Sequence, residues 1–340
     1  MTISRKSQIC LEETPYYYCV SRCVRRAFLC GEDRLSGRSY EHRREWVVDQ
    51  LKQLTEVFAI GISAYAVMHN HNHIVVKVDQ SCALAWSKDE VIFRWTRLYN
   101  PSPIVARYLD GIKLSKAEKA VVSEDIEKWR HRLYDISWFM RNLNETIARR
   151  ANEEDGCTGR FWEGRFKSQA LLDVAALLTC MSYVDLNPIR VAIAETPENS
   201  DFTSIQERIR YCHETLKQTG DRKKAQIDAP KGLLPFIGGE HQDKQQGLSF
   251  SLADYLELTD WAGRAIRDDK SGAIPSHLSP ILERLNIDPE AWLDTVQNYN
   301  KNYYTVVGTR EAIRDYSNAL GRKWFCLTRS SSQLYQCAAT

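Results

Sequence analysis

Three histidines alternate within the run from Tyr65 to Val76: His69, His71 and His73. The flanking residues are apolar and largely β-branched, which favours an extended chain, and alternate side chains of a strand share one face. The three imidazoles are therefore expected to project together. Because neutral imidazole is a common metal ligand, this spacing predicts a metal or phosphate site built on a sheet. The alternative is that these histidines are only solvated or hydrogen-bonded to backbone near a strand end.

A second segment, from Met181 to Arg190, carries Tyr183 and Asn187 four residues apart. On a helix these two side chains lie on the same face, one turn from each other. A phenol can act as a nucleophile, and an amide oxygen can complete the coordination sphere of a metal ion. For this pair taken alone, the alternative is an ordinary half-buried tyrosine and an asparagine at the helix end before Pro188.

The composition is that of a folded protein, with 340 residues of which 43% are hydrophobic. No stretch of the sequence is long and apolar enough to span a bilayer, and the N-terminus has no apolar signal core, so we expect a cytoplasmic protein. The net charge of +2 does not by itself require a nucleic-acid partner, so any basic surface must be local. The ten cysteines include no C-x-x-C pair and are expected to be reduced thiols, although Cys19 and Cys23 leave a structural zinc site open.

The elements that must position these side chains follow from the periodicity of the sequence. Strands are expected over 15–21, 59–68, 71–78 and 160–171, and helices over 39–58, 136–152 and 173–187. The charged, helical segment 81–133 is expected to be an insertion. The resulting β-α-β-β-α-β-α order predicts an α+β protein with a ferredoxin-like antiparallel sheet and the histidine strand in its middle.

The chain is expected to divide into a catalytic domain over 1–200, a linker over 201–250 and a helical C-terminal domain over 251–340. The linker prediction depends on the polar composition of residues 219–249, which are rich in Gly, Lys and Gln. Four helices are expected beyond it, over 252–267, 275–285, 288–299 and 309–320. Their basic residues, Arg310, Arg314, Arg322 and Lys323, would be either DNA contacts or a solvated face.

Three motifs in one order resemble the REP-associated tyrosine transposases, which are single-strand transposases of the HUH endonuclease superfamily. They are Asn70-His71-x-His73, then Gly159-x-x-Trp162-Glu163-Gly164-Arg165-Phe166-Lys167-Ser168, then Tyr183-x-x-x-Asn187-Pro188-Ile189-Arg190. The resemblance covers roughly residues 10–200 without the insertion.

The resemblance implies a mechanism as well as a fold. His71 and His73 would hold a divalent cation, Mg²⁺ or Mn²⁺, with Asn187 as the third protein ligand, and Tyr183 would be the nucleophile. The substrate would be a single-stranded DNA hairpin, cut through a 5′-phosphotyrosine intermediate, which implies a nucleoid-associated protein, and a monomer is the preferred state. The chain departs from the family pattern at Asn72, where an apolar residue is usual, and at His69, where a small residue or proline is usual. We expect Asn72 to point away from the metal and His69 to be a bystander.

The predicted DNA contacts are basic residues in two local clusters. They are Arg160, Arg165 and Lys167 before the tyrosine helix, and Arg22, Arg25 and Arg26 after the first strand. Trp162 and Phe166 are either stacking platforms for bases or core residues. Two other functions stay open: a domesticated protein that binds DNA hairpins without cutting them, and a zinc-dependent structural module.

Overall fold

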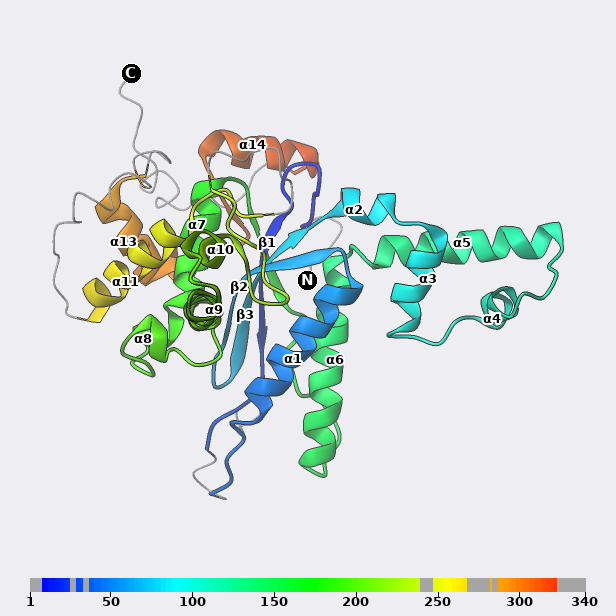
Figure 1. Ribbon diagram of the computed structural model, residues 1–340, viewed down its shortest axis with the longest axis horizontal. Helices are drawn as coiled ribbons and strands as arrows, with labels where there is room; N and C mark the ends of the chain where they lie inside the picture. Colours follow the sequence, from blue (N-terminus) through cyan, green and yellow to red (C-terminus); the bar gives the residue numbers. More distant parts are fainter. Residues whose placement is uncertain are drawn as a thin grey trace.

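The computed structural model describes residues 8–24, 29–32, 37–238, 247–267, 282 and 287–322. It is a mixed α+β structure in which helices cover both faces of a five-stranded sheet (Figure 1). The strands are β1 (Tyr16–Arg22), β2 (Ile60–Val67), β3 (His71–Val78), β4 (Lys167–Leu171) and β5 (Val306–Val307).

The strand order in the sheet is β2-β3-β1-β4-β5. Strand β3 pairs antiparallel with β2 and β1, and β1 pairs antiparallel with β4, whereas β5 runs parallel to β4. The predicted order of elements and the interior position of the histidine strand are both confirmed. Strand β5 was not predicted, and β4 is shorter than the expected strand over 160–171.

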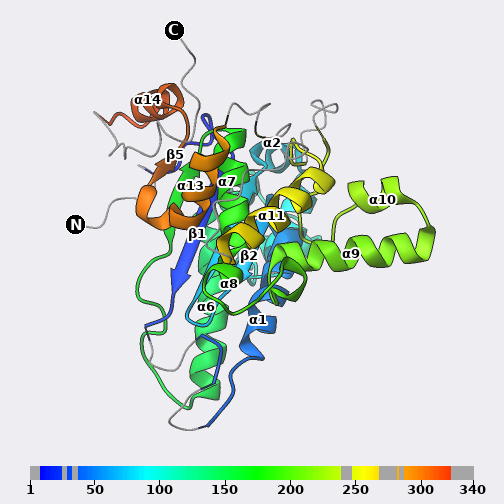
Figure 2. The ribbon, with the colours of Figure 1, turned by 90° about the vertical axis from the view of Figure 1, so that its left-hand side faces the viewer.

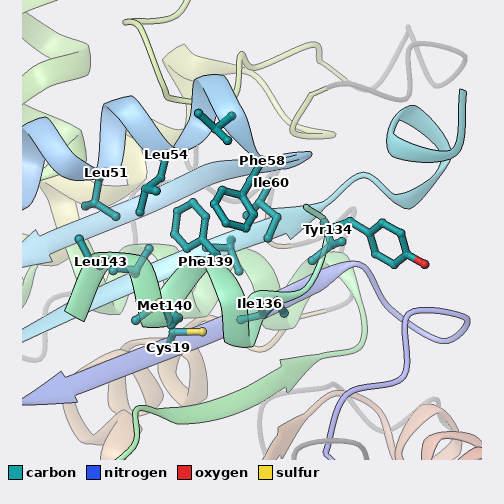
Figure 3. Packing of buried hydrophobic residues seen from close by; sticks show 14 of the residues in the cluster. Cys19, Leu51, Leu54, Phe58, Ile60, Tyr134, Ile136, Phe139, Met140 and Leu143 are labelled. Carbon is teal, nitrogen blue, oxygen red and sulfur yellow. The ribbon is translucent and has the colours of Figure 1, made fainter. Parts of the chain in front are cut away.

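One face of the sheet is covered by α1 (Arg43–Val57) and α6 (Ile136–Glu154). Leu51 and Leu54 of α1 face Phe139 and Leu143 of α6, and all four side chains are at most 1% exposed (Figure 3). Each such burial contributes about 1.5–3 kcal/mol of hydrophobic free energy. This apolar layer packs on the face of the sheet opposite the candidate site and holds the sheet in place.

The opposite face is covered by α7 (Val174–Asp185), followed directly by α8 (Asn187–Arg190). Every residue of α7 from 175 to 185 is buried, so this helix lies in the interior between the sheet and outer helices. The side chain of Asp173 caps its start by accepting from the backbone of Ala176 at 2.8 Å. The helix ends earlier than predicted, and Pro188 lies in the first turn of α8, where a missing backbone N–H costs little.

The C-terminal end of α7 is held by the buried carboxylate of Asp185. It accepts hydrogen bonds from the Ser204 hydroxyl at 2.5 Å, the Ile205 backbone at 3.1 Å and the Tyr255 hydroxyl at 2.5 Å. Burial raises the pKa of Asp185 to about 6, although these donors act in the opposite direction. The network ties α7 to its neighbours two residues beyond Tyr183.

The predicted insertion over 81–133 is helical, as expected. It forms an arm that projects from the sheet (Figure 1) and contains α2 (Gln80–Ala85), α3 (Lys88–Thr96), α4 (Pro103–Leu109) and α5 (Lys116–Arg132). Trp95 of α3 stacks on Trp129 of α5 with ring centroids 5.6 Å apart, and it also contacts Trp138 of α6. This aromatic cluster joins the arm to the core.

The prediction of a linker over 201–250 is wrong for residues 204–227. This segment forms α9 (Ser204–Thr219) and α10 (Arg222–Ile227), which Figure 2 shows extending from the body of the protein. Arg208 of α9 is 2% exposed and donates to the carbonyl of Ser63 in β2 at 3.0 Å. The polar composition reflects the exposed faces of α9, which packs on β2 through one side, and of α10, which packs on α9 and α11.

Three of the four predicted C-terminal helices are confirmed: α11 (Leu252–Arg267), α13 (Pro289–Asn302) and α14 (Arg310–Ala319). The helix expected over 275–285 falls almost entirely outside the described residues. A short 3-10 helix, η2 (Pro197–Asn199), precedes α9. Within the described segments, no helix is both long and apolar enough to cross a membrane, and none of the eight cysteines there forms a disulfide bond.

Candidate active site

Strand β3 presents two of the three predicted histidines to α7. His71 and His73 alternate with Asn72, and their rings lie 4.5 Å apart at an angle of 79°. His69 lies in the turn before β3, where its ring packs so near Gly31 that a Cβ there would come within 3.1 Å of it. The expectation that all three histidines share a strand face is therefore wrong for His69, because β3 begins only at His71.

Asn72 points to the opposite face of the sheet, as predicted, because side chains alternate along a strand. It is fully buried, and neither atom of its amide group has a hydrogen-bond partner in the part of the chain that the structure describes. The polar side chain therefore lies in the layer packed under α1 and α6, and not in the candidate site.

His73 is held from both sides of its ring. Its Nδ1 lies 2.5 Å from the hydroxyl of Tyr18 in β1, and its Nε2 lies 3.0 Å from the side-chain nitrogen of Asn187. Since an amide nitrogen can only donate, Nε2 is the accepting nitrogen and Nδ1 carries the proton, which the Tyr18 oxygen accepts. The lone pair of Nε2 therefore faces Asn187.

Helix α7 brings Tyr183 to the same cluster. Its ring meets that of His73 edge to face, with centroids 5.8 Å apart, and stacks on Tyr299 of α13 at 4.7 Å. The phenol oxygen accepts from Arg190 at 3.3 Å and from the side chain of Asn300 at 2.5 Å. The structure thus brings together the predicted residues His71, His73, Tyr183 and Asn187.

Burial controls the charge state of the two imidazoles. It lowers the pKa of His73 well below its usual value, and it lowers the pKa of His71 to about 4, with smaller contributions from the Arg22 and Arg190 guanidinium groups. Both imidazoles are therefore neutral near pH 7, which is the form that binds metal ions. Burial also raises the pKa of Tyr183, whereas nearby Arg190 acts to lower it.

The residues present fit a divalent cation. Two neutral imidazoles and the side-chain amide of Asn187, which is 1% exposed, converge beside the phenol. The Asn187 amide nitrogen faces His73 in this structure, so a turn of the amide about its Cβ–Cγ bond would bring its oxygen to the ion. Such a mixed nitrogen and oxygen donor set suits Mn²⁺, and Mg²⁺ when phosphate and water supply further oxygens. Among the residues that the structure places, no group of three or more His, Cys, Asp or Glu side chains could hold a metal ion, so the candidate site depends on Asn187 as its third ligand.

The predicted DNA-contact residues lie at one end of the sheet. Arg22 is exposed and stands opposite His71 in the register of β1 and β3. Residue 162 forms a bridge with Cys23, so the segment that carries Arg160 runs beside the end of β1. Arg160, Arg165 and Lys167 are exposed, whereas Arg25 and Arg26 lie outside the described residues.

Trp162 and Phe166 belong to the core. They are 8% and 7% exposed, and the indole nitrogen of Trp162 donates to the backbone of Asn144 at 2.7 Å. Both are therefore core residues in this structure, which is the second of the two alternatives left open by the sequence, and not stacking platforms for bases.

Three residues at the site were missed in the sequence: Tyr18, Arg190 and Asn300. Tyr18 lies in a predicted strand, but the sequence does not say which strand lies beside the histidines. Arg190 belongs to one of the quoted motifs without an assigned role. Asn300 is 117 residues from Tyr183, and no local pattern links the two.

No protein-family model matches this sequence, and no curated protein matches it. A solved structure described as "Structure of the REP associates tyrosine transposase bound to a REP hairpin" is similar at a TM-score of 0.36 and 12% sequence identity, over 68% of this chain and 97% of that chain. A similarity at this level carries no functional argument, so the function has to be argued from the geometry of the site.

Proposed function

We propose that this protein is a metal-dependent endonuclease and strand transferase that cleaves and rejoins single-stranded DNA at hairpins. The observation that carries the proposal is the meeting of Tyr183, His73 and Asn187, although 114 residues separate His73 from Asn187. The β2-β3-β1-β4 order of antiparallel strands supports a ferredoxin-like fold of the HUH type.

The reaction begins with attack of the Tyr183 oxygen on the phosphorus of a phosphodiester. The phenolic proton leaves to water, a bond forms between Tyr183 and phosphorus, and the bond from phosphorus to the 3′ oxygen breaks. The departing oxygen takes a proton and becomes a free 3′-hydroxyl, while the DNA keeps a 5′-phosphotyrosine link. Attack by the same or another 3′-hydroxyl reverses these steps, so rejoining needs no external energy source.

The neighbouring side chains have separate roles. Arg190 lies beside the phenol oxygen, and its Nε is buried without a partner among the residues described, so a phosphodiester oxygen would satisfy it. His71, His73 and Asn187 would hold Mg²⁺ or Mn²⁺, which when bound would polarise the scissile phosphate. Tyr18 keeps His73 in the tautomer whose Nε2 carries a lone pair, which accepts from Asn187 in this structure and would bind the ion.

The proposed DNA path follows the exposed basic residues at the histidine end of the sheet. Arg22 beside His71 would contact the phosphate next to the cut, and Arg160, Arg165 and Lys167 would contact the backbone of the hairpin. Because one chain supplies both the imidazoles and the phenol, a monomer suffices for the reaction.

The experiment is capture of a covalent adduct with 5′- and 3′-labelled single-stranded hairpins whose flanks are randomised, incubated with Mn²⁺ and separated under denaturing conditions. The wild type should retain the 3′ label on the protein and release the 5′ label on a fragment that ends in a 3′-hydroxyl. Tyr183→Phe should lower adduct formation by about 10³-fold or more without changing the hairpin Kd. Tyr304→Phe, at a tyrosine 67% exposed and outside the site, is the matched control. Hairpin binding by the wild type without any adduct would identify a non-cutting binding protein. If the wild type neither binds the hairpin nor forms an adduct, both functions are excluded.

A further inference from the structure

The C-terminal helix α13 is part of the candidate site. It starts at Asp288, whose side chain accepts from the backbone of Ala291 at 2.8 Å, and it lies alongside α7 (Figure 2). Trp292, Val296 and Tyr299 are fully buried on the side that faces α7. A helix anchored by three such side chains is a fixed part of the fold rather than a loosely attached cover.

Helix α13 is kinked before its last turn. The backbone of Asn298 departs from helical values, with φ −110° and ψ 19°, so the helix is kinked there. The Asn298 side chain donates to Asp294 at 2.9 Å and accepts from Lys301 at 3.1 Å, which stabilises both sides of the kink. The turn that follows carries the two residues that reach Tyr183.

Tyr299 fixes the position of its neighbour Asn300. Its ring stacks on Tyr183 at 4.7 Å with an angle of 17°, and its hydroxyl donates to the Gln169 side chain in β4 at 2.6 Å. Asn300 itself is exposed, and its amide nitrogen lies 2.5 Å from the phenol oxygen of Tyr183. The phenol oxygen of Tyr183 is therefore in direct contact with the side chains of Asn300 and Arg190.

We propose that Asn300 is a catalytic residue that stabilises negative charge on the phenol oxygen of Tyr183, an inference that rests on the proposed function. In the rejoining step, the bond between phosphorus and this oxygen breaks and the electron pair stays on the oxygen. Two donors, the Asn300 amide and the Arg190 guanidinium, already point at that atom and need no rearrangement. The C-terminal region therefore supplies half of an oxyanion-type site for the departing tyrosine.

The two directions of the reaction should differ in their dependence on Asn300. In the covalent intermediate the oxygen is an ester oxygen and a poor acceptor, so the hydrogen bond forms only as the tyrosine leaves. In cleavage the hydrogen bond from Asn300 already exists with the neutral phenol. Removing Asn300 therefore loses only the strengthening of this hydrogen bond as negative charge develops on the oxygen. Removing the donor should therefore slow rejoining by about 10²-fold and cleavage by about tenfold.

The test uses the full chain with Asn300→Ala, Asn300→Asp and Asn300→Gln, and Gln297→Ala on the same helix as the control. Single-turnover adduct formation and rejoining of the isolated adduct by a 3′-hydroxyl strand are measured with the hairpin Kd and the Tm. Asn300→Asp, which has the same shape but accepts instead of donating, should be slower than Asn300→Ala. Asn300→Gln should recover part of the rate, while Kd and Tm stay at their wild-type values.

Three outcomes would overturn the role of Asn300. They are wild-type rates in Asn300→Ala, faster adduct formation (which would make Asn300 a block over the nucleophile), and an equal loss in both directions accompanied by a lower Tm. If the wild type forms no adduct at all, the proposed function fails first. The hydrogen bond is then still tested by the ¹³C signal of the Tyr183 Cζ at fixed pH, assigned with Tyr183→Phe, because no change of that signal in Asn300→Ala would show that the contact is absent.

Discussion

At the scale of single residues, the hydroxyl of Tyr18 decides which nitrogen of His73 is free to bind a ligand. Replacing Tyr18 with Phe keeps the ring that stacks on His73 at 5.7 Å but removes the acceptor for Nδ1–H. We expect Tyr18→Phe to weaken Mn²⁺ binding by about 10–100-fold with little change in Tm, because outer partners of ligating histidines act to this extent. Isothermal titration calorimetry measures the affinity. Tyr16→Phe in the same strand is the control, and equal Mn²⁺ affinity in Tyr18→Phe would contradict the assigned tautomer.

The buried amide of Asn72 is expected to reduce stability. Because neither of its polar atoms has a partner among the described residues, Asn72→Leu should raise the free energy of unfolding by about 1–3 kcal/mol. Urea unfolding checks this value, and Asn72→Asp should change it in the opposite direction by burying a charge. A lower stability of Asn72→Leu would mean that the amide is hydrogen-bonded through water.

The candidate site could be predicted from sequence only as far as local spacing reaches. His71 and His73 share a strand, and Tyr183 and Asn187 lie four residues apart, so each pair has a local signature. Tyr18 and Asn300 have none, because their contacts depend on which strands become neighbours and on where a distant helix packs. The position of His69 also depends on one fact that alternation cannot give, namely the residue at which β3 begins.

At the scale of elements, the projecting arm is anchored separately from the site. Trp129 of α5 is 5% exposed and stacks on Trp95, so Trp129→Ala should lower the free energy of unfolding of the arm by about 3–5 kcal/mol. Hydrogen exchange measured by mass spectrometry should rise in α3 and α5 but not in β3 or α7, and adduct formation should keep the wild-type rate. Val121→Ala on the exposed face of α5 is the control. Faster exchange in β3 or α7 would show that the arm supports the site.

Periodicity predicted those elements that bury a single face or a regular apolar stripe, such as α1 and α6. It failed where packing decides. Helix α9 has a polar composition yet inserts Arg208 under β2, and β5 has only two residues, too few for any pattern to show. The expected strand over 160–171 shortens because the backbone bends at residues 163–165, which leaves Trp162 in an isolated bridge with Cys23 before β4 begins.

At the scale of the whole molecule, Glu56 at the end of α1 connects segments that are distant in sequence. It pairs with Arg97, just after α3, and with Lys231, beyond α10. These two cations lower the pKa of Glu56 to about 2, below the 4.5 expected of an unfolded chain. Its stabilising effect is thus complete above pH 4.5 and is lost as the pH falls toward 2.

Glu56→Gln should therefore lower the Tm slightly at pH 7, and the difference from the wild type should vanish as the pH approaches 2. Thermal unfolding followed across this pH range measures the difference. Because the side chain is 31% exposed, added salt should reduce the effect. A difference that does not change with pH would show that the carboxylate charge is not the cause.

The pairing of β4 with β5 sets an order of events during synthesis. Residue 306 pairs with residue 170, so a growing chain that already contains β4 exposes an open sheet edge until about 136 further residues have been added. At roughly 5–20 residues per second that interval lasts roughly 7–27 s. An unpaired edge recruits other chains, so the nascent protein is most prone to aggregate during this interval, before α14 is synthesised.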